Sequence, residues 1–84
     1  MNQDFTSLIS ASTEALEVGK QGKAEEFAIA IDKALEMVKD QKLNGDSPKL
    51  QRVGVKLKTA KKMGKEGNMK AATEAIEEAL SIVK

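Results

Sequence analysis

Positive charge is concentrated in one stretch of the sequence, between residues 49 and 65. Seven basic side chains lie there with no acidic residue among them, although the whole chain has 14 basic and 13 acidic residues. Such a cluster is suited to binding a polyanion, because lysine and arginine neutralise phosphate groups. The candidate residues for polyanion binding are Lys49, Arg52, Lys56, Lys58, Lys61, Lys62 and Lys65.

A structural role competes with polyanion binding. On a helical wheel these cations flank an apolar stripe on both sides, where they would meet neighbouring helices and cover the core edge with their aliphatic stems. No aromatic side chain lies between them to stack on bases, which disfavours nucleic acid as a partner. We favour the structural role and keep polyanion binding as an alternative. The acidic residues that could pair with the cations are Glu14, Glu17, Glu74 and Glu78.

Two rows of carboxylates could attract a hard cation such as Ca²⁺ or Mg²⁺. The sequence has no EF-hand pattern, and without histidine it cannot form the Glu-x-x-His motifs of a di-iron bundle. We therefore interpret the rows as solvated helix faces. They consist of Asp32, Glu36 and Asp40, and of Glu74, Glu77 and Glu78.

Catalytic chemistry has little support, because the chain contains neither histidine nor cysteine. Disulfides and thiolate metal sites are excluded, and hydroxyls such as those of Ser7, Ser10, Ser12 and Thr13 lack the commonest general base. Thioethers could bind Cu(I), but methionine beside an apolar stripe usually fills core space. We predict a protein that is not an enzyme and has no metal or cofactor. The three methionines concerned are Met37, Met63 and Met69.

Capping residues and helical periodicity divide the chain into four helices, near 4–21, 24–43, 48–66 and 69–83. Asp4 is a candidate N-cap, and Ser47 precedes a proline at the first helical position. Gly22 and Gly67 are placed to end helices, and Asn68 can cap the last one.

The apolar stripes of these helices give the expected core. Aromatic residues are almost absent, so aliphatic side chains and alanine must fill it. The predicted core consists of Phe5, Leu8, Ala15, Leu16, Phe27, Ile31, Leu35, Val38, Leu50, Val53, Leu57, Ala60, Ile76, Ala79, Leu80 and Val83.

The sequence repeats itself with an offset of 45 residues. One amphipathic hairpin cannot bury its apolar face alone, whereas two can cover each other. We therefore predict a single all-α domain over 1–84, an antiparallel up-down-up-down four-helix bundle built from hairpins 4–43 and 48–84. The ten identical pairs are Ala15/Ala60, Gly19/Gly64, Lys20/Lys65, Gly22/Gly67, Ala30/Ala75, Ile31/Ile76, Ala34/Ala79, Leu35/Leu80, Val38/Val83 and Lys39/Lys84.

Gly19 and Gly64 stand one turn before the glycines that end their helices. A glycine inside a helix costs about 1 kcal/mol relative to alanine. Its recurrence indicates either a close approach of backbones or early fraying of the helix end, and the sequence leaves both open.

The repeated turn resembles that of the small metal-binding protein family, which consists of short, histidine-rich periplasmic four-helix bundles. The likeness lies in residues 18–23 and 63–68 and continues into Ala34-Leu35 and Ala79-Leu80. The resemblance implies a four-helix bundle, divalent transition-metal binding and a periplasmic location if a leader was removed; otherwise we expect a cytoplasmic protein. The positions at which the family carries histidine hold Val18, Lys23, Ala30, Met37, Met63, Asn68, Ala75 and Ile82.

The remaining function is contact with another macromolecule. We predict an interaction or scaffold module with an unknown partner, with weak metal binding through the family resemblance as an alternative. Ile29 and Val55 project away from the predicted core, and a shared apolar patch would indicate a partner surface. No apolar run approaches the roughly 20 residues needed to cross a bilayer, so no transmembrane segment is expected.

Overall fold

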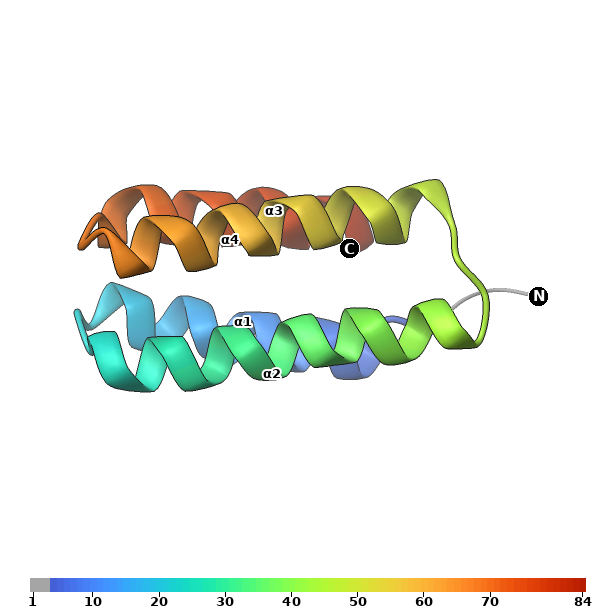
Figure 1. The fold of residues 1–84 in the computed structure, drawn as a ribbon, viewed down its shortest axis with the longest axis horizontal. Helices are drawn as coiled ribbons and strands as arrows, with labels where there is room; N and C mark the ends of the chain where they lie inside the picture. The colour runs from blue at the N-terminus through green and yellow to red at the C-terminus, as the bar shows by residue number, and fades with distance from the viewer. Residues whose placement is uncertain (1–3) are drawn as a thin grey trace.

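The computed structural model describes residues 4–84, and in that range it contains four α-helices and no strand. The helices are α1 (Thr6–Lys20), α2 (Ala24–Leu43), α3 (Pro48–Lys65) and α4 (Met69–Val83). They lie side by side along the long axis of a body that measures 38 × 18 × 17 Å (Figure 1). The predicted all-α fold class is confirmed. None of the helices in the described range is long and apolar enough to cross a membrane.

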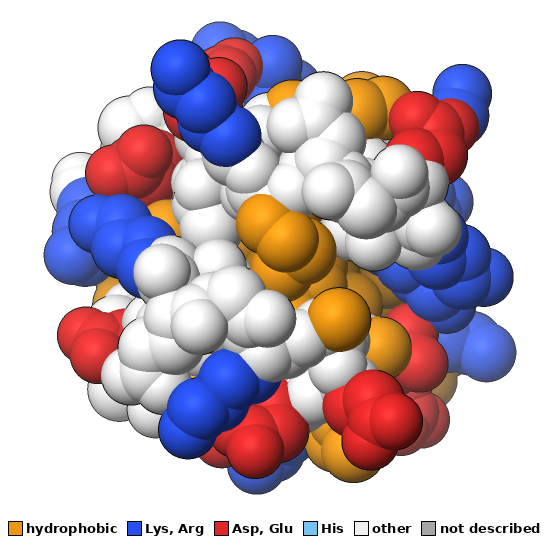
Figure 2. Space-filling view, turned by 90° about the vertical axis from the view of Figure 1, so that its left-hand side faces the viewer, with side chains coloured by type: hydrophobic (Ala, Val, Ile, Leu, Met, Phe, Trp, Pro, Cys, Tyr) orange, Lys and Arg blue, Asp and Glu red, His pale blue; other side chains and the backbone are white. Residues whose placement is uncertain are grey.

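Each helix packs against two others. α1 contacts α2 and α4, and α3 contacts the same two helices. The short turns after α1 and after α3 lie at one end of the molecule, and the connection from α2 to α3 lies at the other (Figure 1). Seen from the end that carries the two turns, hydrophobic side chains show at the centre, and charged side chains of both signs surround them (Figure 2).

The capping residues predicted for α3 and α4 are confirmed. The Ser47 side chain accepts a hydrogen bond from the Leu50 amide at 3.1 Å, and Pro48 occupies the first helical position. The Asn68 side chain accepts a bond of the same length from the Ala71 amide. Each cap satisfies one amide that the first helical turn leaves without a backbone partner.

The N-cap predicted for the first helix is wrong by one position. Phe5 occupies the N-cap position of α1 without a side-chain cap, and the helix begins at Thr6 rather than at residue 4. Asp4 still serves this end, because its Oδ1 accepts hydrogen bonds from the Thr6 amide at 2.9 Å and the Thr6 hydroxyl at 2.5 Å. Two helices also end one residue earlier than predicted, since Gln21 and Glu66 are C-cap residues.

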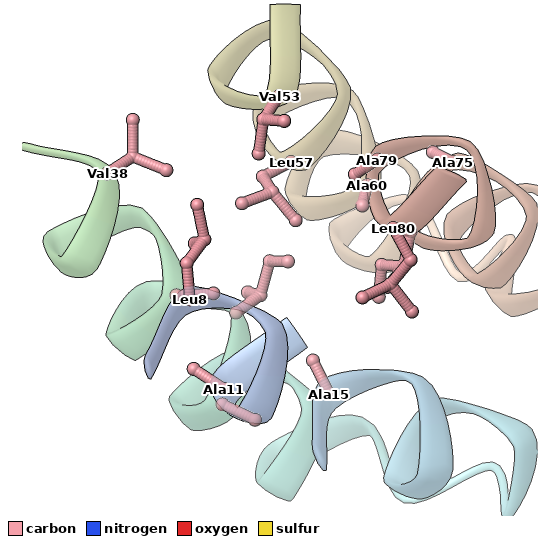
Figure 3. Packing of buried hydrophobic residues seen from close by; sticks show 14 of the residues in the cluster. Leu8, Ala11, Ala15, Val38, Val53, Leu57, Ala60, Ala75, Ala79 and Leu80 are labelled. Carbon is pink, nitrogen blue, oxygen red and sulfur yellow. The ribbon is translucent and has the colours of Figure 1, made fainter. Parts of the chain in front are cut away.

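All four helices contribute side chains to one core. In Figure 3, Leu8 of α1, Val38 of α2 and Leu57 of α3 point toward the space between the helices, with small side chains of α4 beyond them. Twelve of the predicted core residues are buried. The other four, Phe5, Leu16, Leu35 and Val83, are only half-buried and pack against the edge of the core.

Alanines are the core residues that the prediction missed. Small side chains let helices approach closely, so an alanine can be fully enclosed without belonging to a strongly apolar stripe. Ser12 is the buried polar residue in the described range, with 2% of its surface exposed. The additional buried alanines are Ala11, Ala30, Ala34, Ala72 and Ala75.

The Phe27 ring lies between two helical glycines near the turn end. A Cβ on Gly19 would stand 3.0 Å from Phe27 Cδ1, and a Cβ on Gly64 would stand 2.6 Å from Phe27 Cε2. Both distances are below normal carbon–carbon contact. Gly19 and Gly64 therefore mark a close approach of backbone to a buried ring, which decides between the two interpretations left open by the sequence.

We predict that Gly64→Ala destabilises the protein by about 1–3 kcal/mol, because the added methyl group overpacks the Phe27 ring. In a Phe27→Leu background the same change should cost much less, since the smaller side chain leaves room. Urea unfolding of the unmodified protein, the two single variants and the double variant measures the coupling between positions 27 and 64. Equal effects of Gly64→Ala in both backgrounds would contradict the overpacking explanation.

The connection between α2 and α3 is ordered by an acidic side chain. Asp46 accepts hydrogen bonds from Gln51 Nε2 at 3.0 Å and from the Ser47 amide at 2.9 Å. The bond from Gln51, helped by the Ser47 amide and the nearby charge of Lys42, lowers the pKa of Asp46 below its ordinary value. Because the pKa of Asp46 is lowered in the folded state, its ionised carboxylate stabilises the fold at pH values above the unfolded-state pKa. This stabilisation is lost as the pH falls through the folded-state pKa.

We expect an NMR titration of the Asp46 carboxyl carbon to have its midpoint below the ordinary aspartate value of about 3.9. Gln51→Ala should raise that midpoint, because it removes the strongest hydrogen bond to the ionised form. Gln21→Ala is a control far from the carboxylate. An unchanged midpoint in Gln51→Ala would show that Gln51 does not stabilise the charged carboxylate.

Candidate functional site

The basic residues of α3 lie on both sides of its buried face. Toward α4, Lys56 Nζ stands 2.6 Å from Glu78 Oε1. Toward α2, Lys61 Nζ stands 2.7 Å from Asp32 Oδ1. Two of the seven cations therefore have the structural role that was predicted for the cluster.

The partners of these two lysines fit the sequence prediction unequally. Glu78 is one of the four acids expected to pair with the cluster. Asp32 was assigned to a solvated row on α2, and although it is exposed it also bridges to α3. The other expected acids, Glu14, Glu17 and Glu74, form no ion pair with α3 within residues 4–84.

The remaining five cations of α3 are exposed and free of ion pairs in the part of the chain that the structure describes. Lys58, Lys62 and Lys65 follow one another at helical spacing on the side that faces α2 or solvent. Lys49 and Arg52 lie on the side of α4. The predicted polyanion-binding residues are thus divided, and the side toward α2 keeps the larger share of unpaired charge.

A groove runs along the seam between α2 and α3. Its larger cavity has a volume of about 430 Å³ and an apolar floor formed by Leu35, Val38 and Gly54. This volume lies within the usual range for small-molecule sites, about 300–1,000 Å³. The charged residues that line the cavity are Lys39 and Lys42 of α2, Lys58 and Lys61 of α3, and the acids Asp32 and Glu36.

Lys39 and Lys42 are the site residues that sequence reasoning missed. Both belong to the acidic half of the sequence, where they do not stand out as a cluster. Packing of α2 on α3 brings them to the same cavity as Lys58 and Lys61, so four lysines face two acids there. Their spacing of three residues on one helix face was the signal available in the sequence.

A second cavity of about 340 Å³ continues the groove toward the turn end. Phe27, Ile31 and Gly64 contribute to its apolar lining. It shares Asp32 and Lys61 with the larger cavity, so the ion pair between these residues stands where the two cavities meet. Its charged residues are balanced: Glu25 and Asp32 stand beside Lys61 and Lys65.

Gly54 lies on the floor of the larger cavity, and its packing differs from that of Gly19 and Gly64. A Cβ on Gly54 would stand 3.4 Å from Val38 Cγ1, which is close to ordinary contact. Packing therefore does not demand glycine here, although glycine inside α3 costs about 1 kcal/mol relative to alanine. Gly54 lines the cavity without a side chain of its own.

The exposed apolar residues do not combine into one patch. Val55 is 62% exposed and lines a cavity of about 460 Å³ between α3 and α4 together with Ile82. Ile29 is 72% exposed on α2, and Leu43, which the sequence analysis did not single out, is 82% exposed near the end of α2. Ile29 and Val55 thus stand on different helices, and Val55 alone borders a described cavity.

The expected metal-binding alternatives gain no geometric support in the described range. Residues 4–84 contain no group of three or more histidine, cysteine, aspartate or glutamate side chains that could hold a metal ion. Met37, Met63 and Met69 are half-buried and pack against the hydrophobic core, which agrees with their interpretation as filler.

Comparison with known proteins leaves the site to be interpreted from its geometry. No family model, curated protein or solved structure matches this chain. The resemblance to the small metal-binding family stays a prediction.

We predict that the Lys61–Asp32 pair contributes no more than about 1 kcal/mol to stability, because both side chains are partly exposed. A double-mutant cycle with Lys61→Gln and Asp32→Asn measures the coupling, which should shrink in about 1 M salt. The matched control is a second cycle that uses Lys62→Gln instead of Lys61→Gln. Lys62 has no ion pair to Asp32, so this cycle should show no coupling. A salt-independent coupling of several kcal/mol would contradict this assignment.

Proposed function

We propose that this chain is an antiparallel up-down-up-down four-helix bundle made of two copies of one hairpin. The two turns support the repeat. Gly22 and Gly67 have φ angles of 73° and 81°, and each amide bonds to the carbonyl three residues earlier, at 3.1 Å. The next residue in each turn, Lys23 or Asn68, bonds to the carbonyl five residues earlier. Both turns are therefore Schellman motifs.

The bundle serves, in this proposal, as a non-enzymatic binding module that contacts an anionic partner through the α2–α3 groove. One observation carries the proposal: lysines from two different helices face each other over an apolar floor. Lysine stems can cover the apolar lining while their ammonium groups remain available to an anion. Interaction surfaces commonly combine an apolar centre with a charged rim in this way.

Three hydroxyl groups are bonded within their own helices. Thr13, Thr59 and Ser81 each donate a hydrogen bond to a backbone carbonyl of their own helix. A hydroxyl engaged in this way is not activated as a nucleophile, which requires a neighbouring base. Weak metal binding rests on the family resemblance alone, and no contact described above favours it.

The groove predicts a position-dependent affinity for heparin. At low salt the protein should be retained on a heparin column, and Lys39→Gln/Lys58→Gln should elute at clearly lower salt because both cations line the groove. Lys49→Gln/Lys70→Gln removes the same charge elsewhere and should elute close to the unmodified protein. Equal elution of the two variants would show that net charge alone drives retention. Passage of the unmodified protein in the void volume would overturn the proposed function.

A further inference from the structure

We propose that the α2–α3 groove binds a fatty acid, with the alkyl chain lying on the floor around Gly54 and the carboxylate held by lysines. This inference rests on the proposed function and names the class of anion. The observations that carry it are the shape of the floor, the position of the unpaired cations and the absence of a structural reason for Gly54.

The floor fits an alkyl chain. It is apolar over Leu35 and Val38, and Gly54 lines it without a side chain. A helix, with a diameter of roughly 10–12 Å including side chains, is too wide for a cavity of about 430 Å³ between two packed helices. An alkyl chain needs only van der Waals contact with carbon atoms on each side, about 4 Å away.

The cations select an anionic head group. Lys61 is already paired with Asp32 at 2.7 Å, at the point where the two cavities meet. Lys39, Lys42 and Lys58 line the larger cavity and form no ion pair in the described part of the chain. In this proposal lysines of the cavity hold the carboxylate, and the alkyl chain lies over Leu35 and Val38.

The other cavities lack this combination. The cavity between α3 and α4 contains Val55 and Ile82, but its Lys56 is paired with Glu78 at 2.6 Å. The cavity between α1 and α2 is lined by Ala11 and Met37 as well as by polar side chains, and Lys33 is its single cation. An apolar floor and several unpaired lysines therefore coincide at the α2–α3 groove.

Gly54 makes the proposal testable by substitution. Gly54→Met places an unbranched side chain over the floor, whereas Gly54→Ala adds one methyl group near ordinary contact distance from Val38. Thr59→Ala is the matched control, because it also raises helix propensity in α3 but lies on an exposed position outside the groove. Circular dichroism of each variant establishes that the helices are retained.

The experiment follows backbone amide shifts of the full chain during titration with sodium dodecanoate below its micelle-forming concentration. We expect saturable shifts at Gly54 and Val38, an affinity at least tenfold higher than that for hexanoate, and no comparable shift at Val55. Gly54→Met should lose at least tenfold in affinity, Gly54→Ala should lose less, and Thr59→Ala should bind normally. Lys39→Gln/Lys58→Gln should also weaken binding, unlike Lys49→Gln/Lys70→Gln.

Several outcomes would overturn the inference. Equal binding of dodecyltrimethylammonium would show that charge does not select the ligand, and normal binding by folded Gly54→Met would show that the floor is not the site. Shifts with phosphatidylglycerol vesicles but not with dodecanoate would point to a membrane surface instead. If dodecanoate fails while groove-dependent heparin retention remains, this inference falls and the proposed function stands; failure of both removes the proposed function as well.

Discussion

The packing of the bundle depends on one aromatic ring held between two glycines. Phe27 is almost fully buried, and neither Gly19 nor Gly64 can accept a Cβ without overlap with the ring or its neighbours. The ring thereby brings α2 into contact with both α1 and α3 at the turn end. Forty-five residues later stands Ala72, which is fully buried.

Close packing at the turn end has a consequence for the rest of the molecule. Because many core residues are alanine, the helices are held near one another by contacts of small side chains. The seam between α2 and α3 has a cavity on each side of the Asp32–Lys61 pair, one beside Phe27 and one beside Val38 and Gly54. The groove between these two helices therefore continues past the buried Phe27 ring, which fills the centre of the molecule beneath it.

The sequence predicts the helices well because their boundaries are encoded locally. Ser47 and Asn68 cap the helices that follow them, and Gly67 ends α3, through interactions that span only a few residues. The error at the first helix has the same local origin. Asp4 accepts a hydrogen bond from the Thr6 amide, two residues away. The helix therefore starts later than predicted, although Asp4 still bonds to its first turn.

The candidate site was predicted only in part, because it depends on contacts between helices. Periodicity shows which side of α3 carries Lys58 and Lys61, but it does not show that Lys39 and Lys42 face them from α2. It also assigns Asp32 to a solvated face, since the position opposite the core of α2 does not reveal a partner on another helix. The same limit applies to the buried alanines. An alanine adds little to the periodic pattern of hydrophobicity, although close packing of the helices buries its side chain completely.

Electrostatics gives a physical reason to expect an anion beside α3. Lys58 and Lys62, and Lys61 and Lys65, are four residues apart, and like charges at this spacing destabilise a helix by roughly 0.2–0.5 kcal/mol for each pair. Asp32 relieves this repulsion at Lys61 only. The glycine at position 54 weakens the same helix further, and packing does not require it. In our proposal these two costs are retained because this side of α3 binds an anion, since local inconsistencies in a sequence are expected at functional sites.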